Sequence, residues 1–208
     1  MIPKSHPYWH VRSIVEANPH VATLSMSYYS YSPQTVSDLR SKWDLPSGQF
    51  LDSQQMESII DDTPEGHELA MHSIVMFDNG ECRHLVMVDM STSAKAHLEK
   101  LRAYLDDQFF QRLAWFKSGR SFHGYGEDFL LKEDWIKFMG LLLLANKPRV
   151  EPTVDPRWIG HRLLAGYSAL RWTKNTAHYL AVPTRMASNG IMKSSLTEIG
   201  ALGKPLRR

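Results

Sequence analysis

Cysteine and long apolar runs are nearly missing from this sequence. Cys82 is the single cysteine in 208 residues, so the chain can form no internal disulfide, a usage typical of reducing compartments. The longest apolar run, FMGLLLLA at residues 138–145, is far too short to span a bilayer. The first ten residues, MIPKSHPYWH, lack the charged and then apolar layout of a signal peptide. We therefore expect a cytoplasmic protein with no membrane partner.

The sequence also lacks the short motifs that identify several enzyme classes. It has no H-E-x-x-H and no paired C-x-x-C, so the usual zinc sites are excluded. It has neither a G-x-x-x-x-G-K-[ST] loop nor a G-x-S-x-G elbow, which excludes a P-loop and the nucleophile of an α/β-hydrolase. The net charge is only +2, so any contact with nucleic acid must come from a local basic patch.

What the sequence does contain is a mixture of strand and helix patterns. Apolar, β-branched runs on both sides of the DNG at residues 78–80 predict a hairpin whose second strand ends at Asp89. Ser32 followed by Pro33 is typical of a helix start, so a helix is predicted to begin there. Further helices are predicted at 93–110, 131–147 and 157–167, and further strands at 113–117, 168–173 and 177–183. The predicted class is α+β with a largely antiparallel sheet.

Length and composition indicate a single domain. With 43% hydrophobic residues, a chain of 208 residues can bury one substantial core. We expect this core at about residues 73–183, with residues 1–72 part of it or packed on it. Residues 184–208 are expected to form a basic tail.

Asp89 stands where an apolar strand leaves the core. A carboxylate in that place is held rigidly and still reaches solvent, which suits a metal ligand. Aspartate is also common where strands simply end and turns begin, and the residue alone leaves this alternative open.

The stretch SGRSFHGYG at residues 118–126 interrupts the apolar pattern with glycines, hydroxyls and cations. Gly119 would let the backbone approach a ligand closely, and Arg120 and His123 can donate hydrogen bonds to phosphate. On a strand, Ser121 and His123 point to the same face, so both could line a cleft. The alternative is a polar sheet edge with a solvated histidine.

Asp155 follows a proline-broken loop and has cationic or titratable neighbours in the sequence. They are Arg157, His161 and Arg162, while Arg171 and Lys174 add two more cations around a later strand end, which could also be an ordinary solvated strand terminus. A carboxylate beside several cations suits a site for a metal-bound triphosphate. The same composition is found in ordinary surface ion-pair clusters, which contribute little.

Taken in order, these signals resemble the catalytic core of the archaeo-eukaryotic primase superfamily, the primase-polymerases. Members of that superfamily carry an acidic strand end (D-x-D or D-x-E), an S-x-H strand, a later lone aspartate and then a basic strand. SGRSFH at residues 118–123 is similar to their S-G-x-G-x-H form, and residues 155–172 look like the third-motif region of the bacterial and mobile-element members. The resemblance covers roughly residues 73–183.

The resemblance implies an RRM-like, largely antiparallel sheet with flanking helices, joined to a smaller α/β unit, with the active cleft between them. It implies that Asp89 and Asp155 hold Mg²⁺ or Mn²⁺ and that they are catalytic together with His123. By position, the nucleotide would be contacted by Ser121, His123, Arg171, Arg120 and Lys174, and the nucleic acid by Arg157 and Arg162.

One departure from the superfamily pattern affects the expected chemistry. Where a second carboxylate should stand two residues after Asp89, this chain has Ser91. A hydroxyl is a far poorer ligand for a hard cation than a carboxylate is, and nucleotidyl transfer uses two metals. Either Glu151, Asp61 or Asp62 completes the site, or the site binds nucleotide without efficient catalysis.

Two functions follow from the resemblance. The first is a primase or primase-polymerase that transfers a nucleotide from an NTP or dNTP to a 3′-hydroxyl on single-stranded DNA or a primer-template, in replication of a plasmid, phage or similar element. The alternative is a catalytically weakened primase-fold subunit that binds nucleotide or single-stranded DNA beside a helicase or other replication proteins. A third interpretation is that the order of the motifs is a coincidence in an unrelated hydrolase or binding domain.

Overall fold

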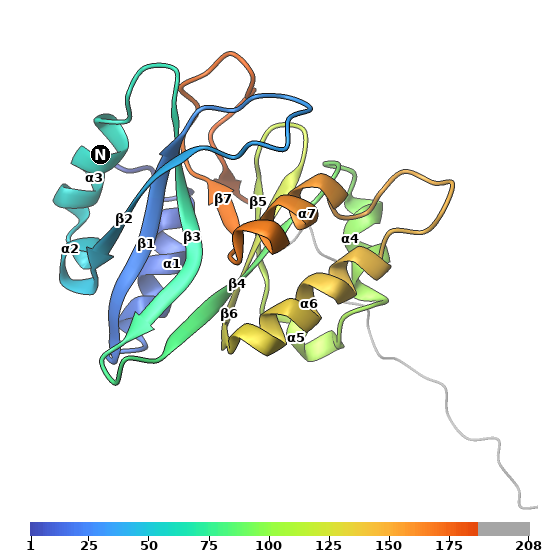
Figure 1. Cartoon of the computed structure of the whole chain (residues 1–208), viewed down its shortest axis with the longest axis horizontal. Coiled ribbons are helices and arrows are strands. Elements are labelled where there is room, and N and C mark those ends of the chain that lie inside the picture. The colour runs from blue at the N-terminus through green and yellow to red at the C-terminus, as the bar shows by residue number, and fades with distance from the viewer. Residues whose placement is uncertain (187–208) are drawn as a thin grey trace, which may run out of the picture.

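An eight-stranded antiparallel sheet is the framework of residues 1–186, the part of the chain that the computed structural model describes (Figure 1). The strands lie in the order β2-β1-β3-β4-β6-β5-β8, and β7 pairs with β3 off this path. Their bounds are β1 (Val21–Tyr29), β2 (Arg40–Pro46), β3 (Glu68–Phe77), β4 (Cys82–Asp89), β5 (Ala114–Lys117), β6 (Phe122–Leu130), β7 (Ala169–Arg171) and β8 (Thr184–Arg185). The expected α+β class with an antiparallel sheet is confirmed.

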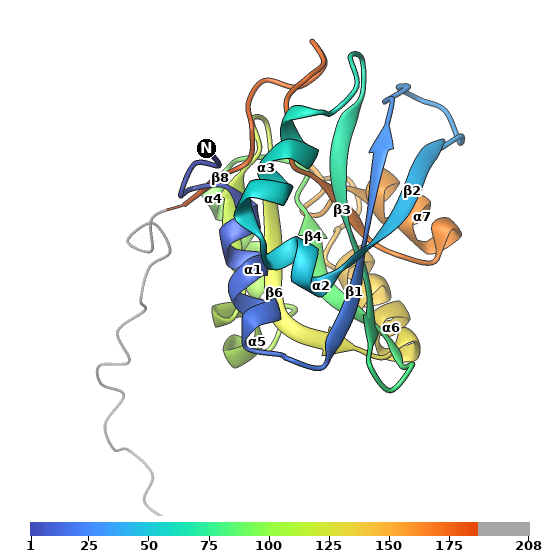
Figure 2. The same cartoon turned by 90° about the vertical axis from the view of Figure 1, so that its left-hand side faces the viewer.

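Helices cover both faces of the sheet (Figure 2). One face carries α1 (Pro7–Glu16), α2 (Ser47–Leu51) and α3 (Ser53–Asp61), and the other carries α4 (Lys95–Arg102), α5 (Asp107–Gln111), α6 (Lys132–Leu144) and α7 (Pro156–Ala165). Alternate residues of β4 join different cores: Leu85 and Met87 pack with α1, whereas Val86 and Val88 pack with α6. This is the side-chain alternation of a strand that is buried on both faces.

β3 has a different partner along each half of its length on the β4 side. Its C-terminal half pairs with β4, where Ile74 faces His84, and its N-terminal half pairs with β7, where Ala70 faces Arg171. Both partners are antiparallel to β3, so β4 and β7 run in the same direction. The ends of both strands, Asp89 and Arg171, therefore reach the same end of β3.

The helix predicted to begin at Pro33 is wrong. Residues 30–39 connect β1 to β2 without helix or strand, and Arg40 begins β2. Gln34 has a φ of 57°, a left-handed conformation that a helix does not contain. Ser-Pro favours a turn as well as a helix start, and pairing of β2 with β1 decides between them here.

The predicted helix at residues 93–110 is two helices. α4 ends at Arg102, and Asp106 starts α5 because its carboxylate accepts hydrogen bonds from the backbone N–H groups of Gln108 and Phe109, at 2.9 and 3.1 Å. An aspartate in this position is a strong helix N-cap. Apolar periodicity continues across the break, and so the sequence pattern hides it.

The strand predicted at residues 177–183 is also wrong, because that segment is irregular. β7 pairs with β3 and not with a neighbour in sequence, and β8 follows later and pairs with β5. Cys82 is exposed at the start of β4.

Residues 1–72 contribute to the sheet itself. They supply α1, β1, β2, α2, α3 and the first residues of β3. Of the predicted basic tail, residues 187–208 lie outside the described part of the chain. Within residues 1–186, no helix has the length and apolar character needed to cross a membrane.

Candidate functional site

The pairing of β4 with β6 brings Asp89 next to His123. The two residues are direct partners in the antiparallel register. His123 Nε2 lies 3.7 Å from Asp89 Oδ1, and the Ser121 hydroxyl donates to the same carboxylate oxygen over 3.5 Å. Phe122, between the two polar residues, packs into the core on the other face, as strand alternation requires.

A short stretch of backbone pairing places Asp155 beside Asp89. Met90 and Val154 form an antiparallel bridge, and the Asp155 N–H donates to the Asp89 carbonyl at 2.9 Å. The Ser91 N–H donates to the Thr153 carbonyl at 3.2 Å. The first and third predicted motifs are therefore fixed to each other by main-chain hydrogen bonds, although 66 positions separate them in the sequence.

These three residues line one cavity of about 170 Å³. Its other acidic, basic and histidine lining residues are Asp38, Arg40, Arg157, His161, Arg162 and Arg171. The cavity is thus strongly polar and holds carboxylates and guanidinium groups together. A phosphate that carries a divalent cation presents the complementary charges.

Asp89 is the carboxylate with the less favourable surroundings. Burial raises its pKa, and the nearby charge of Asp155 raises it further, to about 8, against the opposing effects of Arg171 and Ser121. Two carboxylates held together without a counter-ion favour protonation of one of them. A cation between them would remove that repulsion.

Polar atoms without partners surround the cavity. Six buried side-chain nitrogens of the described residues lack a hydrogen-bond partner, and three of them belong to cavity residues: His123 Nδ1, Arg162 Nη1 and Arg171 Nε. An unpaired buried polar group costs about 1–3 kcal/mol. Such atoms are where a ligand would find hydrogen bonds ready to be made.

His123 is neutral and Arg171 is held in place by its contacts. Burial and the neighbouring Arg171 lower the pKa of His123 well below its ordinary value, so the imidazole is neutral. Arg171 Nη2 donates to the Ser118 carbonyl at 3.1 Å, Nη1 donates to the Thr173 carbonyl, and the guanidinium lies 4.0 Å from the centre of the Tyr179 ring. The Arg171 side chain is therefore positioned before any ligand arrives.

The donor set fits one divalent cation. Asp155 uses Oδ1 to cap α7, accepting from the backbone N–H groups of Arg157 and Trp158 at 2.8 and 3.2 Å, while Oδ2 accepts no hydrogen bond from the described residues. Mg²⁺ is commonly held by one or two carboxylates together with water and substrate phosphates. No group of three or more His, Cys, Asp or Glu side chains within residues 1–186 is arranged to hold a metal ion. Asp89 and Asp155 are therefore the two carboxylates that could hold one ion here.

None of the acids considered as substitutes for the missing carboxylate lines the cavity. Glu151 lies on the surface with Oε2 3.6 Å from His97 Nε2, and Asp61 and Asp62 stand at the end of α3. The third carboxylate that lines the cavity is Asp38, which sequence reasoning missed. It is already paired with arginine, so the described residues offer no free replacement.

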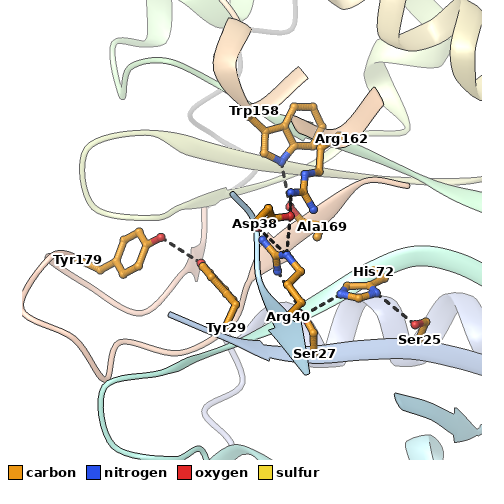
Figure 3. Close-up of polar contacts among 10 residues, drawn as sticks. All are labelled: Ser25, Ser27, Tyr29, Asp38, Arg40, His72, Trp158, Arg162, Ala169 and Tyr179. Atoms are coloured by element: carbon orange, nitrogen blue, oxygen red, sulfur yellow. Dashed lines mark hydrogen bonds and ion pairs between the residues drawn. The ribbon is translucent and has the colours of Figure 1, made fainter. Parts of the chain in front are cut away.

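Asp38 and its partner Arg40 lie in the segment mistaken for a helix. Arg40 Nε lies 3.0 Å from both carboxylate oxygens of Asp38, and Arg162 Nη2 donates to Asp38 from the other side (Figure 3). The D-x-R spacing at residues 38–40 was the only local signal. Arg162 lies 124 positions away, so nothing in the local sequence reveals the pairing.

Lys174 and Arg120, expected at the nucleotide, are not brought to this cavity. Glu68 is buried and accepts hydrogen bonds from the backbone N–H groups of Asn175 and Thr176, at 2.9 and 2.8 Å, which turns the chain away after β7. Lys174 consequently lines a separate cavity. Arg120 is exposed and donates to a backbone carbonyl in the loop before β8.

The glycines of SGRSFHGYG allow a tight turn of the backbone and close packing of side chains against the strand. Gly119 has a φ of 95° in the turn between β5 and β6, and a Cβ there would come within 3.2 Å of the Leu180 side chain, so its neighbour is protein rather than a ligand. A Cβ on Gly124 would lie 2.7 Å from the Trp115 ring. The stretch therefore combines two site residues, Ser121 and His123, with glycines that allow strands to pack closely.

Comparison with known proteins identifies the family. The model of the family described as AEP-like, archaeo-eukaryotic primase 1D-like, matches residues 47–184, which is more than half of the chain. No curated protein and no solved structure matches the chain. The matched residues include Asp89, His123, Asp155 and Arg171, and they begin after Asp38.

Proposed function

The chain belongs to the archaeo-eukaryotic primase-like family, and from this premise we propose that it transfers a nucleotide from an NTP or dNTP to a 3′-hydroxyl, with Mg²⁺ or Mn²⁺ and release of pyrophosphate. The observation that carries the proposal is the convergence of Asp89, His123, Asp155 and Arg171 in one cavity. Single-stranded DNA or a primer-template is the proposed second substrate. The likeness of residues 155–172 to mobile-element primases supports a role in replication of a plasmid, phage or similar element.

Asp89 and Asp155 are the proposed metal ligands. Their backbone pairing keeps the two carboxylates together, and the free Oδ2 of Asp155 remains available while Oδ1 caps α7. The cation, when bound, would neutralise charge on the triphosphate and lower the pKa of the attacking hydroxyl.

His123 and Arg171 are the proposed phosphate ligands. Arg171 is fixed by two carbonyl groups and by the Tyr179 ring, so its guanidinium needs little reorganisation to bind an anion. Neutral His123 adds a hydrogen bond and no second positive charge beside Arg171. Ser121 is bonded to Asp89 and orients that carboxylate.

Template-dependent primer extension tests the proposal directly. The purified chain with Mn²⁺, dNTPs and a primer-template should lengthen the primer, and Asp89→Asn should abolish extension because a metal ligand is lost. Asp78→Asn, a change of the same charge at an exposed residue far along the hairpin, is the matched control and should retain activity. Extension that survives Asp89→Asn would disprove the proposed metal site.

The missing second carboxylate favours one other candidate function, a nucleotide-binding subunit that needs a partner for synthesis. Ser91 is two residues beyond Asp89, at a bend that follows the end of β4, and its hydroxyl takes the place of the second carboxylate of the superfamily pattern. No free carboxylate among the described cavity residues replaces the absent acid.

Ser91→Asp separates the two functions. If the missing ligand limits catalysis, the variant should extend primers faster and bind Mn²⁺ more tightly than the wild type does. If the chain is a partner-dependent subunit, neither protein should extend a primer alone, although both should bind nucleotide. Fast extension by the wild type with no gain in the variant would show that the cavity is complete as it stands.

A further inference from the structure

Two arginines from distant parts of the chain converge on one carboxylate at the cavity. Arg40 begins β2 and Arg162 lies near the end of α7, and both donate to Asp38 (Figure 3). Their side chains are only 8% and 3% exposed. Buried guanidinium groups paired with a single carboxylate leave one positive charge uncompensated, and that charge faces a cavity with room for a ligand.

Among the described residues, Asp38 is the one carboxylate in ion-pair contact with these two arginines, although Asp89 also interacts with Arg162 electrostatically. His72 lies behind Arg40, and burial, together with the charges of Arg40, Arg162 and Lys42, lowers its pKa to about 2, so the ring is neutral. Arg162 Nη1 is buried and has no hydrogen-bond partner among the described residues. One donor of this arginine pair is therefore left for a ligand.

The position of Arg40 is set by a chain of hydrogen bonds behind it. Arg40 Nη1 donates to Ser27 Oγ at 3.2 Å, and Ser27 Oγ lies 2.7 Å from His72 Nε2. His72 Nδ1 lies 3.1 Å from Ser25 Oγ, and Tyr167 stacks on the imidazole at 4.4 Å. The guanidinium is therefore locked in place independently of Asp38.

Asp38 itself belongs to a segment with few attachments. The connection of residues 30–39 has neither helix nor strand, and most of its residues are exposed. Arg157 Nη2 donates to the Thr35 carbonyl at 2.9 Å, Arg162 donates to Asp38, and the Tyr31 ring lies 4.2 Å from the His178 ring. The carboxylate that fills the arginine pair is thus carried on a segment that can withdraw without disturbing the sheet.

We propose that Arg40 and Arg162 form a phosphate-binding site, which Asp38 occupies until a phosphate group of the ligand displaces it. The inference rests on the proposed function in so far as that function supplies a phosphate-bearing ligand, a nucleotide or a DNA strand. Guanidinium groups bind phosphate through paired, charge-assisted hydrogen bonds and exchange one oxyanion for another without rearrangement. Displacement removes one of the two attachments between α7 and residues 30–39, so ligand binding also opens this side of the cavity.

The test measures binding of inorganic tripolyphosphate, a dNTP and a short oligo(dT) in EDTA, so that no metal bound at Asp89 contributes. Asp38→Asn removes the competing charge and keeps the shape of the side chain. It should tighten tripolyphosphate binding about tenfold, equivalent to about 1.4 kcal/mol. Asp44→Asn is the matched control, because Asp44 is an exposed aspartate on β2, the strand that follows Asp38, and does not line the cavity. It should change the affinity less than about twofold, as expected for a screened surface charge.

Two further variants connect the gain to the arginine pair. The double variant Asp38→Asn/Arg162→Gln should lose the gain, because the receiving arginine is gone. Arg162→Lys keeps the charge and the ion pair but loses the planar fork, and should weaken tripolyphosphate binding even if Asp38→Asn proves too unstable to purify. A gain for the dNTP and not for oligo(dT) assigns the site to the nucleotide, and the reverse result assigns it to the DNA backbone.

Equal changes in Asp38→Asn and Asp44→Asn would overturn the inference, because they would show an effect of net charge only. A gain that persists in the double variant, or tripolyphosphate binding unaffected by Arg162→Lys, would overturn it too. The tripolyphosphate measurement involves no base, sugar or reaction. It can therefore succeed if nucleotidyl transfer fails, and it can fail while Asp89-dependent primer extension stands.

Discussion

Asp38 and Asp89 line the same cavity but have opposite electrostatic surroundings. Burial disfavours ionisation of both carboxylates. At Asp38, hydrogen bonds and charges from Arg40 and Arg162 outweigh burial and hold the pKa below its ordinary value. At Asp89, burial and the charge of another carboxylate, Asp155, outweigh the opposing charge of Arg171, and the pKa rises to about 8. Asp38 is thus stabilised in its charged form by two arginines, whereas the charged form of Asp89 is destabilised.

This difference shows how one small cavity can bind a ligand of mixed charge. At one end of the cavity, the carboxylates of Asp89 and Asp155 repel each other. At the other end, Arg40 and Arg162 share the single carboxylate of Asp38. A metal-bound phosphate supplies both missing parts at once, the cation to the aspartates and the anion to the arginines. Substitutions at one end of the cavity at a time test this electrostatic difference.

The largest effect on activity is expected for the proposed metal ligands, Asp89 and Asp155. Asp155→Asn should lower the rate of primer extension by about 100-fold or more, because several kcal/mol of charge stabilisation depend on this ligand. Asparagine is also a good N-cap, so α7 should persist. Asp52→Asn is the matched control, since Asp52 caps α3 with the same geometry and does not line the cavity. Loss of activity in both variants would point to damaged helix capping and not to a metal site.

The next effect is expected at the phosphate ligands. Arg171→Gln should weaken dNTP binding by about 1.5–3 kcal/mol, the usual contribution of a charge-assisted hydrogen bond. His123→Ala should act in the same direction. Arg83→Gln, at a surface arginine paired with Glu81, is the control. Calorimetric titration measures all three, and dNTP affinity unchanged in both cavity variants would contradict the assignment.

The same substitution at the two carboxylates should change stability in opposite directions. Asp38→Asn leaves two buried arginines without their counter-ion and should destabilise the fold by about 2 kcal/mol. Asp89→Asn removes a charge that burial and Asp155 oppose and should stabilise the metal-free fold by about 1 kcal/mol. Urea unfolding near pH 8 measures both. A change in stability of the same sign in the two variants would contradict the opposite electrostatic environments of Asp38 and Asp89.

The last effect is a pH dependence of stability that arises from the neutral histidine behind Arg40. The folded pKa of His72 is lowered to about 2 by burial and by Arg40, Arg162 and Lys42, while Asp38 opposes this, so the unfolded chain binds a proton that the folded chain refuses. Stability should therefore fall as the pH drops below about 6.5, by up to about 1.4 kcal/mol per pH unit.

His72→Gln keeps hydrogen-bonding groups for Ser25 and Ser27 but does not titrate, so its stability should depend less on pH in this range. His20→Gln, at an exposed histidine, is the control. Unfolding at about pH 5 and about pH 7 gives both slopes. Equal slopes in the wild type and His72→Gln would show that the ring accepts its proton in the folded state.

Much of the cavity around Asp89 could be predicted from the sequence, because local sequence patterns mark the strands that carry its residues. The β3–β4 hairpin is marked by its DNG turn, and the strand that follows leads directly to Asp89. Strand alternation correctly placed Ser121 and His123 on one face. The resemblance to a family supplied the link to Asp155, which composition and spacing alone do not give.

The contacts of Asp38 with Arg40 and Arg162 could not be predicted, because they depend on segments that are distant in the sequence. β2 is defined by its pairing with β1, while the local Ser-Pro cue suggested a helix. Arg162 reaches Asp38 across 124 positions. The sequence also misplaced Lys174, because it cannot show that Glu68, far upstream, binds the backbone beyond β7 and turns it away.

The division of β3 between two partners has a mechanical consequence. β4 and β7 run side by side along β3 but hydrogen-bond to different halves of it, so no rung of the described sheet joins β4 to β7 where both strands end. Asp89 ends one of these strands and Arg171 ends the other. Under the proposed function, a nucleotide that contacts both residues would connect two strands that the sheet leaves unpaired at this point. Binding would then also stabilise the sheet around the site, and release would remove that stabilisation.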